Sequence, residues 1–261
     1  MQKLTVIKIG GNIVDDEKAL ADFLLAFAQI HSPKILVHGG GKLATKLACD
    51  LAIPTEMVEG RRITSEAMLP VTVMVYAGLI NKQIVAQLQH YQCDALGVSG
   101  ADAQLILSHK RAIEPIDYGF VGDFTPQEVN STRLHQFLAL GLCPVFSAIT
   151  ADQEGQLLNT NADTIASNLA ISLATHYQVE LVYCFEHQGV LRDRKDEHSV
   201  IPQIHSANFN QLKNEGIISD GMLPKIANAL AAVEQKVHQV CIKSAQDLLK
   251  PTAGTIISQY I

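Results

Sequence analysis

The sequence predicts an α/β protein built as a three-layer α/β/α sandwich around a mainly parallel central sheet. Short Val/Ile/Leu runs alternate along the chain with segments whose apolar residues recur at i, i+3, i+4 and i+7. Strands that alternate with helices form βαβ units, and these give a parallel sheet covered by helices. With 261 residues the chain can build a large core. We expect two lobes, one of residues 1–177 and one of residues 178–261.

The strands and helices follow one another in a regular order. The chain opens with a short strand around Val6, Ile7 and Ile9, and further strands are expected at residues 34–41, 94–100, 143–149, 179–185 and 238–244. Helical periodicity covers residues 17–30, 41–51, 72–89, 162–177 and 222–235. Residues 118–152 are richer in Gly, Pro and polar residues, which favours a hairpin or a surface excursion.

Composition excludes several classes of protein. The net charge of −6 argues against general binding of nucleic acid or of a membrane surface, which both need basic patches. The sequence has no signal-peptide pattern and no apolar run of 18 residues, so we expect a cytoplasmic protein. Five scattered cysteines without CxxC spacing are typical of reduced core thiols. Ten histidines show no HxxxH or HExxH pattern, so no protein-bound transition metal is expected.

The first strand carries an unusual lysine. "TVIKIGG" places Lys8 inside an apolar run that ends at Gly10 and Gly11. Burial of an ammonium group is costly unless an anion meets it, and glycines let a backbone approach a ligand closely. The alternative is a lysine whose ammonium reaches solvent at the edge of the sheet.

A second glycine turn, "VHGGGK", runs from a strand into a helix. Backbone N–H groups at such a helix start suit a phosphate or a carboxylate, and Gly40 and Gly41 are the candidates to present them. The turn matches neither GxGxxG nor GxxxxGK[ST], so a dinucleotide-binding or Walker-type site fits poorly. The chain therefore does not look like a dinucleotide oxidoreductase.

Polar residues at three further places complete the candidate site. In "NTNAD", Asn161 or Asp163 could simply cap the following helix, but a cap uses only one of the three polar residues, and Asn159 and Asp163 lie four apart. Lys225 follows a glycine-containing turn and a proline at a helix start, where a cation is unfavourable without an anion. Of the adjacent Arg61 and Arg62, only one can face a site.

These groups together indicate phosphoryl transfer. Positioned cations and N–H donors neutralise charge on the transferring group. The sequence offers no poised general base, which fits a carboxylate acceptor because that group is already ionised at neutral pH.

The motifs resemble those of the amino acid kinase family. "IKIGGNI", "VHGGG", "EGRRIT", "YGFVGD", "LLNTNADTIAS" and "GIISDGMLPKI" occur in the family's order between residues 5 and 230. The resemblance implies a carbamate-kinase-like fold and the branch of the family that phosphorylates the side-chain carboxylate of N-acetylglutamate in arginine biosynthesis. ATP would bring Mg²⁺ held mainly by its phosphates.

The resemblance also implies roles for individual residues. Lys8 and Lys225 would stabilise the transferring phosphoryl group, and Asp163 would hold both lysines. The acceptor would bind in the lobe of residues 1–177 and the nucleotide in the lobe of residues 178–261. The acceptor-binding residues would be Gly40, Gly41, Arg62 and Asn159, and the nucleotide-binding residues Gly10, Gly11, Glu186, Gly189, Leu191, Ile218 and Ser219.

Two features depart from the family pattern. "FEHQGVLRD" has Glu186 and His187 where relatives carry Asp and Val, which leaves the nucleotide preference open. The chain starts almost directly at its first strand, whereas arginine-inhibited hexameric relatives carry an extra N-terminal helix, so we expect a feedback-insensitive homodimer. N-succinylglutamate, free glutamate, aspartate or carbamate stay open as acceptors. A catalytically silent protein that binds an amino acid is the alternative from another class.

Overall fold

The computed structural model describes residues 1–58, 60–193, 195–218 and 222–259. The expected nucleotide-binding residue Ser219 lies outside these ranges. The chain divides into two compact units, one formed by residues 1–34 with 166–261 and the other by residues 35–165. Residues 1–34, which we expected in the lobe of residues 1–177, thus share a unit with the C-terminal part, because the first strand pairs along its whole length with the strand Gln178–Phe185.

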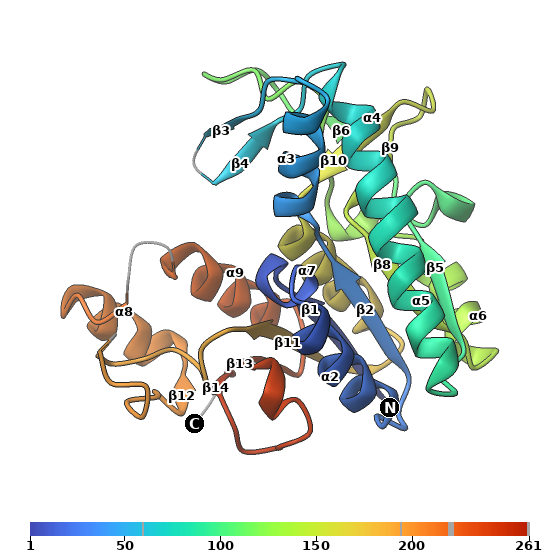
Figure 1. Ribbon diagram of the computed structural model, residues 1–261. Helices are drawn as coiled ribbons and strands as arrows, with labels where there is room; N and C mark the ends of the chain where they lie inside the picture. The colour runs from blue at the N-terminus through green and yellow to red at the C-terminus, as the bar shows by residue number, and fades with distance from the viewer. Residues whose placement is uncertain (59, 194, 219–221, 260–261) are drawn as a thin grey trace. The chain divides into compact units, whose positions relative to one another are not determined.

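The unit of residues 1–34 and 166–261 is an open sheet with helices (Figure 1). Its strands run in the order β12-β14-β13-β11-β1, and all neighbouring pairs are parallel except β13 with β14. Helix α9 packs against β13 and β14. The elements are β1 (Lys3–Ile9), α1 (Gly11–Val14), α2 (Glu17–Ala28), β11 (Gln178–Phe185), β12 (Gln203–Ile204), α8 (Ser206–Asn214), α9 (Leu223–Glu234), β13 (Gln239–Ser244), the 3₁₀ helix η4 (Ala245–Asp247) and β14 (Thr255–Ile257).

The described residues of the unit 35–165 contain strands that belong to three sheets. Strands β2, β8 and β5 are parallel neighbours, with α5 in front of β5 and β8 in Figure 1 and α6 behind. Strands β6-β7-β10-β9 form a second sheet, and β3 pairs with β4 in a hairpin. The elements are β2 (Lys34–His38), α3 (Gly41–Asp50), β3 (Glu56–Val58), β4 (Arg61–Ile63), α4 (Met68–Val73), the π-helix η1 (Met74–Ile80), α5 (Asn81–His90), β5 (Ala95–Val98), η2 (Asp102–Gln104), β6 (His109–Lys110), β7 (Val121–Asp123), η3 (Pro126–Glu128), α6 (Ser131–Ala139), β8 (Cys143–Ser147), β9 (Ile149–Ala151) and β10 (Leu157–Thr160). Helix α7 (Ala162–Leu173) continues from this unit into the other.

Helix α2 shows how local sequence sets an element's ends. The Asp16 side chain accepts a hydrogen bond from Ala19 N at 2.9 Å and caps the first turn. Beyond its last turn, Lys34 Nζ donates to the carbonyl oxygens of Phe27, Ala28 and Ile30 at 3.0, 3.0 and 2.6 Å. A cation at this end complements the helix dipole, so α2 is fixed at both ends.

The expected strands and helices are present, with two differences in secondary structure and one in the burial of a cysteine. Residues 118–152 hold β7, α6, β8 and β9 rather than a simple excursion, and the antiparallel pair β9–β10 supplies a hairpin. Cys49 is exposed, whereas the other four cysteines are buried, so the expectation of core thiols is wrong for Cys49, which points outward from α3.

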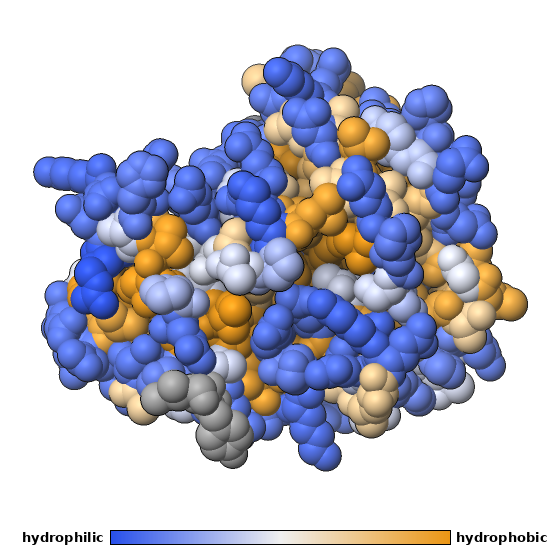
Figure 2. Space-filling model, turned by 90° about the horizontal axis from the view of Figure 1, so that it is seen from below, coloured by the Kyte–Doolittle hydropathy of each residue, from blue (hydrophilic) through white to orange (hydrophobic). Residues whose placement is uncertain are grey.

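The expected helix at residues 72–89 is interrupted by the π-helix η1. The whole helical span Met68–His90 is long and apolar enough to cross a membrane, but half of its apolar window is buried inside the protein, which is typical of a core helix. Hydrophilic side chains cover most of the face drawn in Figure 2, and apolar residues gather in patches between them.

Candidate active site

The glycine turn lies in the unit of residues 35–165, where β2 leads into α3. Gly40 is the N-cap of α3, and Ala44 N bonds back to its carbonyl oxygen at 3.1 Å. A Cβ atom on Gly40 would lie 2.3 Å from Ile80 Cδ1, so the packing of η1 requires glycine here. The amides of the first helical turn have no partner within the helix, and this turn presents them at one place.

Arg62 lies beside this turn and is 7% exposed. Its Nη2 donates to Gly41 O at 2.8 Å and to Thr45 Oγ1 at 2.7 Å. Within the described part of the chain, its buried Nε and Nη1 atoms have no hydrogen-bond partner. One edge of the guanidinium is thus anchored to α3, while two further donors are available to an anion. Arg61 is exposed, as expected for the neighbour that does not face the site.

Asn159 joins the same group of residues through Thr64. Asn159 Nδ2 donates to Thr64 Oγ1 at 2.9 Å, and Thr64 Oγ1 lies 3.4 Å from the Arg62 carbonyl oxygen. Gly119, with φ of 71°, packs so closely against the backbone at Thr64 that a Cβ would lie 2.3 Å from Thr64 O. The motifs "EGRRIT", "YGFVGD" and "LLNTNAD" are therefore held together by direct contacts.

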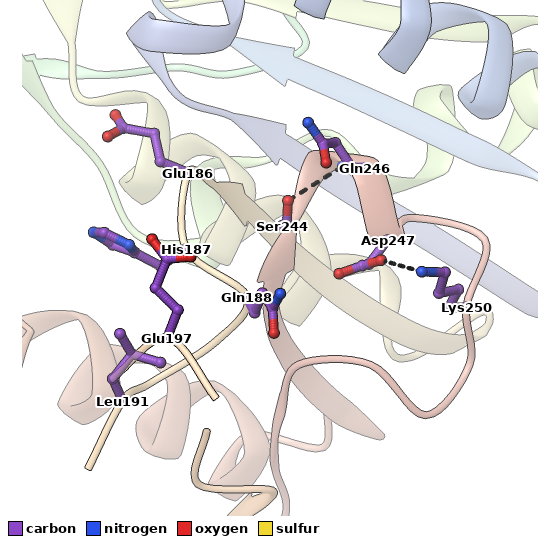
Figure 3. Close-up of a pocket in the computed structure, with 9 residues that line it drawn as sticks. All are labelled: Glu186, His187, Gln188, Leu191, Glu197, Ser244, Gln246, Asp247 and Lys250. Carbon is purple, nitrogen blue, oxygen red and sulfur yellow. Dashed lines mark hydrogen bonds and ion pairs between the residues drawn. The ribbon is translucent and has the colours of Figure 1, made fainter. Parts of the chain in front are cut away.

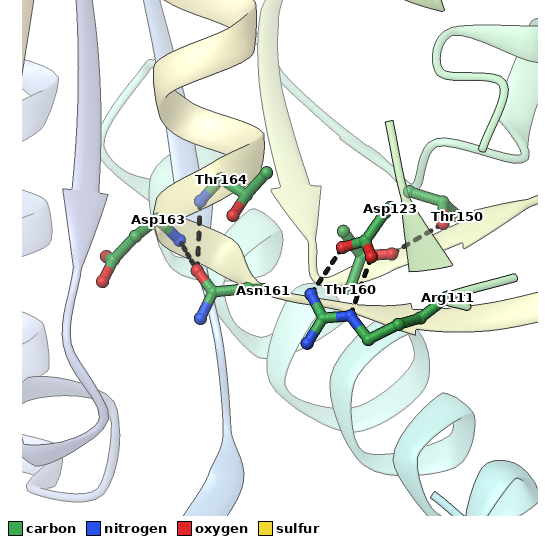
Figure 4. A network of polar contacts seen from close by, with 7 residues as sticks. All are labelled: Arg111, Asp123, Thr150, Thr160, Asn161, Asp163 and Thr164. Carbon is green, nitrogen blue, oxygen red and sulfur yellow. Dashed lines mark hydrogen bonds and ion pairs between the residues drawn. The ribbon is translucent and has the colours of Figure 1, made fainter. Parts of the chain in front are cut away.

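Asn161 caps helix α7. Its Oδ1 accepts hydrogen bonds from Asp163 N at 2.8 Å and Thr164 N at 3.0 Å (Figure 4). The choice that the sequence left open is thereby settled for Asn161, and in Figure 4 the Asp163 carboxylate points away from it. The expected role of Asp163 toward the two lysines stays a prediction.

A bidentate ion pair fixes strands β6 and β7 nearby. Arg111 Nε and Nη2 bond to the two carboxylate oxygens of Asp123 at 2.7 and 2.5 Å (Figure 4). The hydrogen bonds from Arg111 hold the pKa of the Asp123 carboxyl below its usual value. Asp123 therefore stays ionised and keeps the "YGFVGD" segment in place.

Both candidate lysines lie in the unit of residues 1–34 and 166–261, and they meet at one aromatic ring. Lys8 is buried on β1, and its Nζ lies 5.5 Å from the centroid of the Phe185 ring. Lys225 Nζ, from the first turn of α9, lies 4.0 Å from the same centroid. The ring face attracts both cations, and the arrangement concentrates positive charge where an anion would be stabilised.

The glycines of this unit differ in whether the surrounding packing leaves space for a side chain. A Cβ on Gly10 would approach Cys184 O at 3.8 Å, and one on Gly11 would approach Asp15 Oδ2 at 3.6 Å, both ordinary contacts. A Cβ on Gly189 would lie 2.8 Å from Val200 Cγ1. Packing thus explains Gly189, whereas a close-lying ligand would explain Gly10 and Gly11.

A polar pocket of about 310 Å³ opens at the ends of β11 and β13 (Figure 3). The expected nucleotide-binding residues Glu186 and Leu191 line it, and Ile218 is buried elsewhere in the unit. Lys250 Nζ and Asp247 Oδ1 form an ion pair at 2.7 Å at its rim. The remaining lining residues are His187, Gln188, Glu197, Ser244 and Gln246.

The sequence did not indicate several residues that lie beside the two lysines and the glycine turn. Phe185 ends a strand, and no local signal in the sequence indicates that two lysines approach its ring. His38 and Tyr76 both contact the glycine turn, since the Tyr76 ring packs against Gly40 and the His38 ring bonds to Gly39. In the described ranges, no group of three or more His, Cys, Asp or Glu residues is arranged to hold a metal ion.

The whole chain can now be compared with known proteins. The sequence pattern of the amino acid kinase family matches residues 3–244. The chain therefore belongs to the amino acid kinase family.

Within this family the chain is similar to acetylglutamate kinases. The acetylglutamate kinase of Cytophaga hutchinsonii is 49% identical over 251 residues, which cover 96% of this chain and 94% of the relative. That of Bacteroides fragilis is 50% identical over 244 residues, or 94% and 93% of the two chains. The structure of Giardia carbamate kinase superposes with a TM-score of 0.70 at 13% identity, covering 99% of both chains. This likeness confirms the fold class expected from the sequence.

Proposed function

We propose that this protein transfers the γ-phosphoryl group of ATP to the side-chain carboxylate of N-acetyl-L-glutamate, a step of arginine biosynthesis. The observation that carries the proposal is Arg62. Among the residues that the structure describes, its buried Nε and Nη1 have no hydrogen-bond partner, and the side chain lies beside a turn that presents backbone amides. The acetylglutamate kinases of Cytophaga hutchinsonii and Bacteroides fragilis, about half identical over nearly the whole chain, support the choice of acceptor.

The acceptor binds in the unit of residues 35–165. Arg62 donates from Nε or Nη1 to one carboxylate of the acceptor, and the amides of Gly40 and Gly41 bind its other carboxylate. Asn159 bonds to the N-acyl amide, with its Nδ2 already oriented by Thr64. The attacking carboxylate is ionised at neutral pH and needs no general base.

Charge on the transferring phosphoryl group is stabilised by Lys8 and Lys225, and Asp163 is the third proposed catalytic residue. Gly10 and Gly11 offer backbone amides to the nucleotide phosphates, where the space that glycine leaves admits close approach. Mg²⁺ held mainly by those phosphates neutralises further charge. Gly189, Leu191, Glu186, Ile218 and Ser219 belong to the nucleotide side.

The pocket near Glu186 supports nucleotide binding in the unit of residues 1–34 and 166–261. Its carboxylates and amides suit ribose hydroxyls or a base edge better than phosphate. We therefore assign acceptor recognition to residues 35–165 and nucleotide recognition to the pocket side of the other unit.

Acceptor selectivity tests the proposal. The proposed acceptor site has an amide, backbone donors and an arginine, so a free α-ammonium would lose its hydration without gaining a carboxylate partner. We expect kcat/KM for N-acetylglutamate to exceed that for glutamate by at least about 10².

The measurement is formation of hydroxylamine-trapped acyl phosphate from ATP and Mg²⁺ with N-acetylglutamate, N-succinylglutamate, glutamate, aspartate and carbamate. A ratio below ten between N-acetylglutamate and glutamate would refute the assignment of the acceptor. Preference for the succinyl compound would retain the reaction and change only the acyl group. Absence of trapped product with every acceptor would favour a non-catalytic binding protein.

We also propose a homodimer located in the cytoplasm. Met74 and Leu79 are 52% and 48% exposed on the π-helix, and a second copy of the chain would cover them. Light scattering coupled to size exclusion should give twice the mass of one chain, and a monomeric mass would refute the assignment.

A further inference from the structure

A buried histidine contacts the glycine turn directly. His38 is the last residue of β2, and none of its surface is exposed. Its Nδ1 lies 2.9 Å from the carbonyl oxygen of Gly39, and its Nε2 lies 3.1 Å from Nδ2 of Asn81. A carbonyl oxygen only accepts hydrogen bonds, so Nδ1 carries the proton. Nε2 then accepts from the Asn81 amide.

The Asn81 side chain has its orientation fixed by other partners. Nδ2 also donates to the Val145 carbonyl oxygen at 2.9 Å, and Oδ1 accepts from Lys82 Nζ at 3.1 Å. A flipped amide would lose both bonds. Asn81 is 1% exposed, and a Cβ on Gly97 would lie 2.1 Å from its Oδ1, so the side chain packs closely against Gly97. Asn81 thus sets the tautomer of His38.

The helical span Met68–His90, which contains Asn81, also contacts the glycine turn at Gly40. Ile80 Cδ1 and Tyr76 Cδ1 would lie 2.3 and 2.9 Å from a Cβ on Gly40, so both side chains press against this glycine. The π-helix η1 and the first residue of α5 therefore contact the turn at Gly40 and, through His38, at Gly39. Pi-helical turns often occur at functional sites.

We propose that His38 is a positioning residue for phosphoryl transfer. Its Nδ1–H, with the tautomer set by Asn81, fixes the Gly39 peptide so that the amides of Gly40 and Gly41 point to the acceptor. This inference rests on the proposed function and adds to it a hydrogen-bonded chain from Asn81 through His38 to the Gly39 carbonyl.

The electrostatic environment agrees with a neutral ring. Burial lowers the pKa of His38 to about 4, with Lys82 contributing in the same direction and the Gly39 hydrogen bond opposing them. The ring therefore keeps one proton, on Nδ1, throughout the neutral range. It is not a general base, because Nε2 is engaged by Asn81.

The test compares two replacements of His38. In His38→Asn an amide N–H lies near the place of Nδ1 and retains the bond to Gly39, whereas His38→Leu removes the donor. We expect the acceptor KM to rise at least about tenfold in His38→Leu and to stay within about threefold in His38→Asn, with the KM for ATP within twofold in both. Thr72→Val, which removes a buried hydroxyl from the same helical span, is the control and should leave both KM values unchanged.

Two NMR measurements make the test independent of activity. The ¹⁵N spectrum of the histidine rings in the wild-type protein should show His38 protonated on Nδ1. The backbone amide resonances of Gly40 and Gly41 should move in His38→Leu and much less in His38→Asn. Protonation of His38 on Nε2 in the wild type would overturn the inference. An equal rise of the acceptor KM and the ATP KM in both variants would overturn it as well. Absence of kinase activity in the wild type would instead refute the proposed function, while the spectra would still decide the role of His38.

Discussion

Replacing Arg62 by lysine should weaken acceptor binding while leaving nucleotide binding intact. Arginine has five donor hydrogens, and Arg62 uses Nη2 for Gly41 O at 2.8 Å and Thr45 Oγ1 at 2.7 Å. Its Nε and Nη1, which point to different edges of the guanidinium, stay available for charge-assisted hydrogen bonds to an anion. A lysine retains the charge but has one nitrogen, which has to serve either α3 or the acceptor. Loss of one charge-assisted hydrogen bond costs about 1.5–3 kcal/mol.

This free energy corresponds to a rise in acceptor KM of roughly 10- to 150-fold. The assay is steady-state kinetics with N-acetylglutamate varied at saturating ATP and then ATP varied at saturating acceptor. Arg61→Lys is the matched control, since the Arg61 side chain is exposed, and both of its KM values should stay within twofold of wild type. An acceptor KM within threefold of wild type in Arg62→Lys would refute the reasoning, and a rise only in Arg61→Lys would mean that the wrong arginine is assigned.

Three other perturbations follow from the structure. Lys8→Ala and Lys225→Ala should each lower kcat by about 10²- to 10³-fold, since each variant loses a cation that stabilises the transition state. Their circular dichroism spectra should match that of the wild type. Activity within fivefold of wild type would show that the lysine does not belong to the site. His38 has its pKa lowered from 6.5 to about 4, so its contribution to stability is complete above pH 6.5 and is lost as the pH falls toward 4, at up to about 1.4 kcal/mol per pH unit. Urea unfolding between pH 7 and 4.5 should show a steeper loss of stability in the wild type than in His38→Asn, with this slope as the difference, and parallel curves would contradict it. Gly40→Ala should lower the midpoint of urea unfolding because its Cβ collides with η1, whereas Gly10→Ala should fold normally and raise the KM for ATP; equal stability of the two variants would refute the distinction.

The order of strands and helices could be predicted because apolar periodicity is a local property. The strand of Lys8, the turn at Gly40 and the helix after Asn161 are all visible in short stretches of sequence. The different exposure of Arg61 and Arg62 could be predicted too, since only one of two adjacent residues can face a site, and the family motif selected Arg62. These predictions needed no knowledge of distant contacts.

The rest depends on contacts between residues far apart in the sequence. The π-helix η1 has the same apolar spacing as an α-helix, so the pattern over residues 72–89 does not reveal it. His38 bonds to Asn81, 43 residues away, and no local rule links a histidine at a strand end with an asparagine inside a helix. The grouping of residues 1–34 with residues 166–261 follows from the pairing of β1 with β11, which periodicity does not specify.

The central claim is transfer of a phosphoryl group to the side-chain carboxylate of an N-acylated glutamate. The most direct measurement uses N-acetylglutamate labelled with ¹³C at the side-chain carboxyl carbon, incubated with the protein, ATP and Mg²⁺ and followed by ¹³C and ³¹P NMR. The account predicts a new acyl-phosphate signal in which the labelled carbon couples to phosphorus, formed in equal amount with ADP. Release of inorganic phosphate without a coupled carbon, or a phosphorylated α-carboxyl group, would contradict it.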